Sequence, residues 1–310
     1  MRPSTSYRHR LCSFGALTTS YIFQGLSTTR LTMANLFRYA KSGSDWTMND
    51  LLAYNISVSS QSPDDFYGQP LQTVASLNNI DPNLFSGTLG TQGLSDETFR
   101  LLQCLDLARN SGQESAVRDF AKEILRALGY EKRGLLLRSR YAIPLLISDD
   151  LHRSAWTDVC LVQGSSVILM VVQTDEATVD PEPQVIAEAI ATFQYNNRIS
   201  ARLGDPELDL MTIPCIAMLG TRPIFYLVPV TRKLSEAVAA AQHPSPPTVV
   251  KKCVVTSNSY RLSEGMETPD FRQLALWHFT AFRTLAEAHW SLFMTPVEMG
   301  AQYKLQSFRN

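Results

Sequence analysis

Residues 155–176 read AWTDVCLVQGSSVILMVVQTDE, and this stretch decides the fold. After a Gly-Ser turn come six consecutive apolar residues, Val167–Val172, several of them β-branched. Such a run indicates a buried central strand, which we expect to reach Gln173. The segment before the turn, Ala155–Val162, also has the composition of a strand. We therefore expect two neighbouring strands here, with polar residues starting abruptly at the end of the second.

The acid Asp158 lies inside the first of these strands, among largely apolar neighbours. A buried carboxylate without a partner is costly, so Asp158 needs a cation, a set of hydrogen bonds or water. The polar residues Gln173, Thr174, Asp175 and Glu176 follow the second strand. An acid that faces the end of a central strand is well placed to hold a divalent cation with hard oxygen ligands. The sequence therefore predicts a functional site around Asp158.

A helix is predicted before these strands, from Glu114 to about Leu128, where Gly129 ends it. At about 100° per residue, Glu114 lies on the same face as the apolar residues of this helix. Its carboxylate is therefore an inward-facing candidate for the site. The alternative is that an acid in the first turn only interacts favourably with the helix dipole.

A second helix is predicted after the strands, with an Asp-Pro pair at its start. Gln184, Glu188 and Tyr195 form a polar stripe along it, beside a broad apolar face. A polar stripe is ordinarily the solvent-facing side of a helix. These residues are site candidates if the stripe instead turns toward the strand acid.

Alternating or periodic apolar residues predict the remaining elements. The expected strands are Leu135–Ile147, Ile213–Leu219 and Ile224–Val230, and the expected helices are Met48–Tyr54, Asp96–Ala108 and residues 268 to about 293. The order helix, strands, helix, strands, with a buried-strand composition at the centre, indicates an α/β fold. We expect a mixed central β-sheet flanked by helices.

At 310 residues, 45% of them hydrophobic, the chain is long enough for one substantial core. Its N-terminal part is basic, rich in Ser and Thr, and has no acid before Asp45, which is the composition of a mitochondrial transit peptide. The alternatives are a disordered leader and a translation start at Met33. The expected organisation is a leader over 1–44, an N-terminal helical and irregular arm over 45–110 packed on the core, a core with its C-terminal helix over 111–295, and a tail over 296–310.

The charge and the cysteines narrow the function classes. A net charge of −1 argues against strong electrostatic binding of nucleic acid by the protein surface as a whole. It is compatible with a local basic patch. Five scattered cysteines without a CxxC pair favour reduced thiols inside a cell, in the cytoplasm or nucleus, with mitochondria as the alternative. No apolar run approaches the length that spans a bilayer, so no membrane partner is expected.

An acid on one strand, polar residues at the end of the next, and a helix with Gln and Tyr on one side resemble the PD-(D/E)XK, restriction-endonuclease-like pattern. The chain also resembles a large set of uncharacterised fungal proteins over roughly residues 45–290. The matching phrases are Trp46–Ile56, Glu114–Tyr130, Thr157–Leu161, Asp180–Ile190, Gly220–Tyr226 and Ser263–Met266. The resemblance implies a restriction-endonuclease-like core, and it implies that Gln184 and Tyr195 support the site and the nucleic-acid backbone.

The chain departs from that pattern at two positions. The relatives end the central strand in Gln-Glu-Asp-Lys, whereas here Thr174 replaces the metal-binding carboxylate and Glu176 replaces the lysine. A hydroxyl is a poor ligand for Mg²⁺, and an acid repels the phosphate that a lysine would stabilise. No lysine lies between Lys132 and Lys233. We therefore expect weak Mg²⁺ binding at best, lost or weakened phosphodiesterase activity, and a role as a binding or interaction module.

Two alternatives stay open. The first is an active metal-dependent DNA or RNA nuclease in which Asp158 and Glu176 are the carboxylates and Arg198 or Arg138 replaces the lysine. A ligand shifted by two positions stays on the same face of a strand, which makes this geometry conceivable. The second is a purely structural domain that binds protein, which the near-neutral charge also fits. Nucleic acid and protein are thus both candidate partners.

Overall fold

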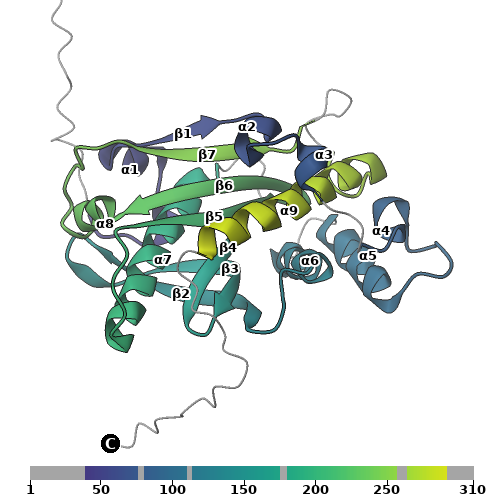
Figure 1. Cartoon of the computed structure of the whole chain (residues 1–310), viewed down its shortest axis with the longest axis horizontal. Coiled ribbons are helices and arrows are strands. Elements are labelled where there is room, and N and C mark those ends of the chain that lie inside the picture. The colour runs from purple at the N-terminus through teal and green to yellow at the C-terminus, as the bar shows by residue number, and fades with distance from the viewer. Residues whose placement is uncertain (1–38, 76–79, 110–113, 175–179, 257–263, 292–310) are drawn as a thin grey trace, which may run out of the picture. The chain divides into compact units, whose positions relative to one another are not determined.

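The computed structural model describes residues 39–75, 80–109, 114–174, 180–256 and 264–291 (Figure 1). These residues contain one mixed sheet with the strand order β1-β7-β6-β5-β4-β3-β2. The pairs β1–β7 and β4–β5 are parallel, and the other neighbours are antiparallel. The strands are β1 (Ile56–Ser60), β2 (Leu135–Ile147), β3 (Asp150–Gln163), β4 (Ser166–Thr174), β5 (Leu210–Leu219), β6 (Arg222–Thr231) and β7 (Thr248–Val254).

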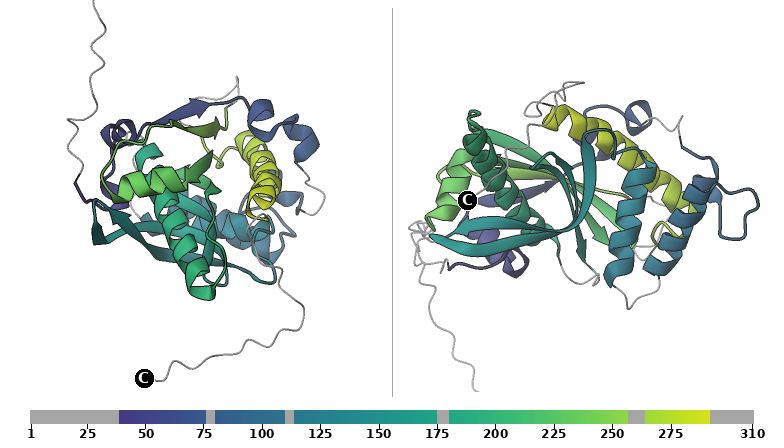
Figure 2. Two further views of the ribbon diagram at one scale, coloured as in Figure 1. Left: turned by 60° about the vertical axis from the view of Figure 1, so that its left-hand side comes forward. Right: turned by 90° about the horizontal axis from the view of Figure 1, so that it is seen from below.

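Helices cover both faces of this sheet, and each face has its own apolar core. α7 packs on one face together with α1 and α8, whereas α5, α6 and α9 contribute to the core on the other (Figures 1 and 2). The long helices are α5 (Asp96–Arg109), α6 (Glu114–Ala127), α7 (Glu182–Leu203) and α9 (Pro269–Trp290). The shorter ones are η2 (Gly43–Asp45), α1 (Met48–Ala53), α2 (Pro63–Tyr67), α3 (Leu71–Val74), α4 (Asn83–Ser86) and α8 (Arg232–Ala239).

The predicted central strand is confirmed as β4. The side chains of Val167, Ile168 and Leu169 are fully buried, and β3 pairs antiparallel with β4, Leu161 opposite Leu169. The helices predicted on either side of the two strands are confirmed as α6 and α7, on opposite faces of the sheet. The expected α/β fold, a mixed central sheet flanked by helices, is therefore confirmed.

Local sequence sets the bounds of α7. Pro183 occupies its first turn, where a missing N–H costs no hydrogen bond. Gly204 follows its last residue with φ +80°, a left-handed backbone that closes helices and that other residues rarely adopt. Because β4 and β5 are parallel, the chain must cross over between them, and α7 is that crossover.

The N-terminal segment is joined to the sheet more closely than an arm laid over a core. β1 is an edge strand of the sheet, with Ile56 opposite Thr248 of β7. Lys41, which the predicted leader included, is buried and forms an ion pair with Asp50 at 2.7 Å. The packed body therefore begins before residue 45. Residues 1–38 of the predicted leader and the predicted tail lie outside the described residues.

The β2–β3 hairpin, a long curved ribbon in Figure 2, changes face along its length. Leu137 and Val159 belong to the core under α6 and α9, whereas Ile143 and Ala155 belong to the core under α7. All four occupy odd positions, and in a regular ribbon such residues stay on one face. The ribbon therefore turns about its own axis between them, near Arg140, whose φ is +50°.

Asn196 of α7 supports the start of β4. Its buried side chain accepts a hydrogen bond from the Val167 N–H at 3.0 Å and donates one to the Val167 carbonyl at 2.7 Å. Asn196→Ala leaves both backbone groups buried without these partners. We expect the free energy of unfolding, measured by urea titration, to fall by roughly 2–4 kcal/mol.

Gln194→Ala is the matched control on the same helix. Gln194 makes the same two bonds to the Leu146 backbone, at 2.8 and 3.0 Å, but it is only half-buried. Water can replace the lost amide there, so we expect a loss below about 1 kcal/mol. Equal losses in the two variants would contradict the role assigned to burial at Asn196.

Candidate functional site

Asp158 lies at the point where β3 leaves β4. The pairing of the two strands starts at Val159, opposite Val171. β4 continues from Val171 to Thr174 in its pairing with β5, whereas the earlier residues of β3 do not pair with it. Asp158 is therefore beside the C-terminal end of β4. On its other side, the ladder to β2 skips the Arg140–Asp158 pair, at the bend of the hairpin.

Arg118 of α6 holds Asp158. Its Nε and Nη2 atoms each lie 3.1 Å from Oδ1 of Asp158. The exposed fractions of the two side chains are only 11% and 21%, so this is a largely buried ion pair. The cation that a carboxylate at this position requires is thus a guanidinium of the protein itself. Sequence reasoning missed Arg118, although it lies one helical turn after Glu114, on the face expected to look inward.

Glu188 of α7 is the second acid of the site. Its side chain is fully buried, and its Oε1 accepts a hydrogen bond from Nε2 of Gln184 at 2.9 Å. Burial raises the pKa of Glu188 well above its ordinary value, and the charge of Asp158 also raises it, whereas hydrogen bonds from Gln184 and Thr157 lower it by less than burial raises it. The neutral form of Glu188 is therefore favoured. Because this side chain is buried, the polar stripe of α7 faces the protein interior at Glu188.

The polar segment 173–176 lies partly outside the residues that the structure describes. Asp175 and Glu176 fall in the range 175–179, outside the described residues. The backbone of Gln173 and Thr174 pairs with Met218 and Leu219 of β5, but their side chains are outside the described set. The same holds for the side chain of the first residue of α6, the predicted site acid Glu114.

A row of cations and aromatic rings runs between β2 and α7. The Arg138 guanidinium lies over the Tyr141 ring, 5.0 Å from its centroid. The hydroxyls of Tyr141 and Tyr195 are 2.9 Å apart, and the Arg198 guanidinium is 5.9 Å from the Tyr195 ring centroid. We call these four residues the cation–tyrosine row. Sequence reasoning named three of them and missed Tyr141, which only the packing of β2 on α7 brings to Tyr195.

One end of the cation–tyrosine row lies next to Asp158 and Glu188, which we call the acid pair. Arg138 is opposite Cys160 in the hairpin, and Cys160 is two residues from Asp158. Burial raises the pKa of the Cys160 thiol to about 12, the Arg138 charge lowers it, and the Glu188 charge raises it, so both groups are near this sulfur. Arg198 is farther away, because ten helical residues separate it from Glu188, or about 15 Å along the axis. Arg198 is therefore poorly placed to replace a lysine at Asp158.

The described acids fit poorly as a ligand set for Mg²⁺. Asp158 already bonds to a guanidinium, and Glu188 favours its neutral form. Mg²⁺ requires ionised or strongly polar oxygen ligands in near-octahedral geometry. Within the described part of the chain, no three His, Cys, Asp or Glu side chains are grouped so that they could hold a metal ion.

No protein-family model and no curated protein sequence matches this chain. Among the helices that the structure describes, none combines the length and apolar character needed to cross a bilayer.

The raised pKa of Glu188 predicts a pH-dependent stability. The folded protein holds the Glu188 proton more tightly than the unfolded chain, where the pKa is near 4.5. The stabilisation of the folded protein by protonated Glu188 is therefore fully present below the unfolded-state pKa. It decreases as the pH rises toward the folded-state pKa. We expect the natural chain to lose more unfolding free energy between about pH 5 and pH 8 than Glu188→Gln, measured by urea titration.

Asp119→Asn, which removes an exposed carboxylate of α6, is the control and should leave the pH dependence of the natural chain unchanged. A Glu188→Gln variant with the same pH dependence as the natural chain would show that Glu188 is ionised in the folded protein.

Proposed function

We propose that this chain has a restriction-endonuclease-like core that has lost phosphodiesterase activity and that it acts as a binding module for a nucleic-acid strand. The ion pair between Arg118 and Asp158 carries the first part of this proposal. A metal-dependent cleavage site needs ionised carboxylates that are open to Mg²⁺. Here a guanidinium already meets the charge of Asp158, and Glu188 favours the neutral form.

The order and pairing of the strands support the proposed core. β2, β3 and β4 form an antiparallel unit, α7 crosses over, and β5 pairs parallel with β4. Asp158 lies beside the end of β4, and Gln184 approaches the site from α7 through Glu188. This is the arrangement that the resemblance implies, with Thr174 and Glu176 as the departures from it.

Metal binding at Asp158 would compete with the ion pair. Both Arg118 contacts are to Oδ1, so a Mg²⁺ ion that takes this oxygen would displace the guanidinium and leave it largely buried beside another cation. Removing one partner of a buried ion pair costs about 3–5 kcal/mol, because the other charge stays uncompensated. Mg²⁺ also gives up its bound water reluctantly, so one available carboxylate is not enough to bind it tightly.

The cation–tyrosine row supports a nucleic-acid strand as the partner. Guanidinium groups bind phosphates and offer flat faces on which bases stack, and Tyr rings add further stacking surface. Arg138 is exposed, and the other three residues are half-buried. With a net charge of −1, the whole chain gives little attraction to phosphate, so a local row of this kind would have to provide it.

An active metal-dependent nuclease is the second candidate, and one observation favours it. Arg118 places a cation 3.1 Å from Asp158, near where the lysine of the relatives would act. In that case Asp158 and Glu176 would hold the metal, and Arg118 would stabilise the charge on the phosphate. Cleavage assays separate the two candidates.

The first assay measures cleavage of labelled DNA and RNA with Mg²⁺ or Mn²⁺. We expect the natural chain and Asp158→Ala to show the same background rate. The triple variant Thr174→Glu/Glu176→Lys/Arg118→Met restores acid-x-Lys and releases Asp158. Its metal-dependent rate should rise about a hundredfold or more above background, since a single catalytic group contributes at least that much.

The double variant that keeps Arg118 is the matched control, and we expect it to cleave more slowly than the triple variant. Circular dichroism verifies that each variant is folded. Metal-dependent cleavage by the natural chain that Asp158→Ala abolishes would overturn the proposal and establish the active nuclease.

The second assay measures binding of a labelled single-stranded oligonucleotide by fluorescence anisotropy. Arg138→Ala/Arg198→Ala should weaken binding about tenfold or more and reduce the salt slope, by about 0.7 for each phosphate that is no longer neutralised. Arg100→Ala/Lys251→Ala removes the same charge from α5 and β7 and should change binding little. Tighter binding of polyglutamate than of the oligonucleotide would contradict the proposal and point to an acidic protein partner.

A further inference from the structure

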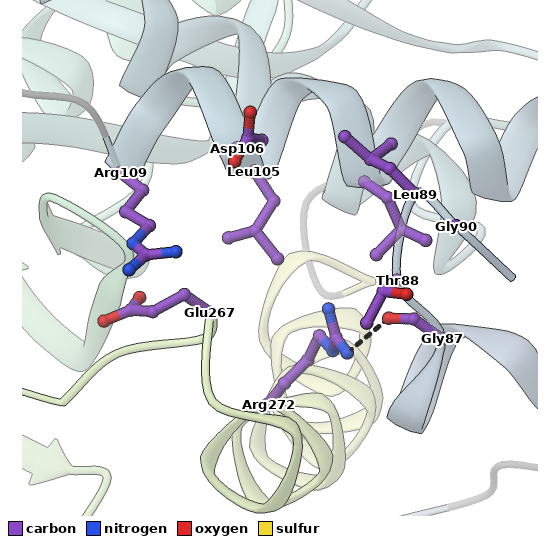
Figure 3. Close-up of a pocket in the computed structure, with 10 residues that line it drawn as sticks. Gly87, Thr88, Leu89, Gly90, Leu105, Asp106, Arg109, Glu267 and Arg272 are labelled. Carbon is purple, nitrogen blue, oxygen red and sulfur yellow. Dashed lines mark hydrogen bonds between the residues drawn. The ribbon is translucent and has the colours of Figure 1, made fainter.

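A cavity of about 320 Å³ lies between the loop of residues 87–90, α5 and the start of α9 (Figure 3). None of its lining residues belongs to β2, β3, β4 or α7, so it is distinct from the acid pair and the cation–tyrosine row. Leu89, Leu102 and Leu105 supply apolar surface. The charged residues that line it are Asp106, Arg109, Glu267 and Arg272.

Arg272, in the first turn of α9, is the most deeply buried charge at this cavity, with 3% of the residue exposed. Its Nε donates to the Phe85 carbonyl at 3.2 Å, and its Nη2 donates to the Gly87 carbonyl at 2.8 Å. Among the described residues, no acid forms an ion pair with it. Burial lowers the pKa of this guanidinium from its ordinary value.

A structural role explains part of this arrangement. The two carbonyls belong to the end of α4 and its following loop, so Arg272 caps a short helix. That role uses Nε and Nη2 of the guanidinium. Carbonyl dipoles compensate a buried cation less completely than an anion does. A negatively charged group in the cavity would complete this compensation.

Arg109, at the C-terminal end of α5, is the second cation at the cavity (Figure 3). It forms no ion pair with an acid of the described residues. The acid nearest to it in Figure 3, Glu267, is already engaged by the Thr221 hydroxyl at 2.6 Å and the Gly265 N–H at 3.0 Å. The Asp106 carboxylate points away from Arg272. The cavity is therefore lined by two cations and two acids, of which Glu267 is engaged by other groups and Asp106 points away from Arg272.

We propose that this cavity binds a small organic oxyanion, a carboxylate or a phosphate monoester, between Arg272 and Arg109, which line it on opposite sides (Figure 3), with its apolar body against Leu102 and Leu105. Guanidinium groups match both oxyanions through paired N–H donors. A volume of about 320 Å³ is within the range of small-molecule sites and exceeds what a bare inorganic ion needs.

Isothermal titration of the full chain with four probes tests this proposal. Phenyl phosphate and benzoate place the two oxyanions on the same apolar ring and so distinguish the phosphate monoester from the carboxylate. Inorganic phosphate lacks the ring, and benzamide lacks the charge. We expect phenyl phosphate or benzoate to bind more tightly than both of these controls and to raise the unfolding temperature.

Variants at exposed positions keep the test independent of folding. Arg109→Ala should weaken binding of the best probe about tenfold or more, and Leu89→Trp should block the cavity mouth. Arg100→Ala removes the same charge from α5 outside the cavity and should leave binding unchanged. The absence of binding by all four probes at millimolar concentration, or binding that Arg109→Ala and Leu89→Trp leave unchanged, would overturn the proposal.

Discussion

The pairing of β4 is the constraint on which the rest of this structure depends. β4 is antiparallel to β3 on one side and parallel to β5 on the other, and the parallel pair requires a crossover. α7 makes that crossover on one face of the sheet, which leaves the other face to α6 and α9. Asp158 lies just past the last β3–β4 pair, Val159 with Val171, because β3 diverges there from β4, which continues to Thr174 beside β5. The acid site is therefore a consequence of this divergence and of one crossover.

Charge compensation at this site comes from both faces of the sheet. The β2–β3 hairpin turns between the two cores close to Asp158, so this carboxylate can meet Arg118 from α6 while Glu188 approaches from α7. Two neighbouring acids in a largely apolar setting cannot both stay charged without a cation. Here one is paired with a guanidinium and the other favours its proton, which achieves within the protein what a bound metal achieves in a cleavage site.

Local charge matters more than net charge for the binding surfaces of this chain. The value of −1 sums all the cations and anions of the chain, and some of them are paired at the surface, as Arg232 is with Glu207 and Asp209. Such pairs contribute little attraction to a ligand. Arg138, Arg198 and Arg272 differ because, among the described residues, they contact rings or carbonyls instead of carboxylates.

The sequence predicted the elements whose signals are local. β4 follows from a continuous apolar run, and α6 and α7 follow from helical periodicity with glycine and proline at their ends, because these preferences act within a few residues. Short polar strands were not predicted. β1 forms because Ile56 meets Thr248, and a pairing across so many residues has no signature in either segment alone.

The candidate site also has one part that the sequence predicted and one part that it did not. The sequence by itself determined that Asp158 needs a cation, a set of hydrogen bonds or water, and that Gln184 and Glu188 share one side of a helix. Only the tertiary structure decided that Arg118 is this cation and that Glu188 is buried. The physical reason is that a helical wheel orders the faces of a helix, whereas burial and ion pairing depend on which other element covers each face.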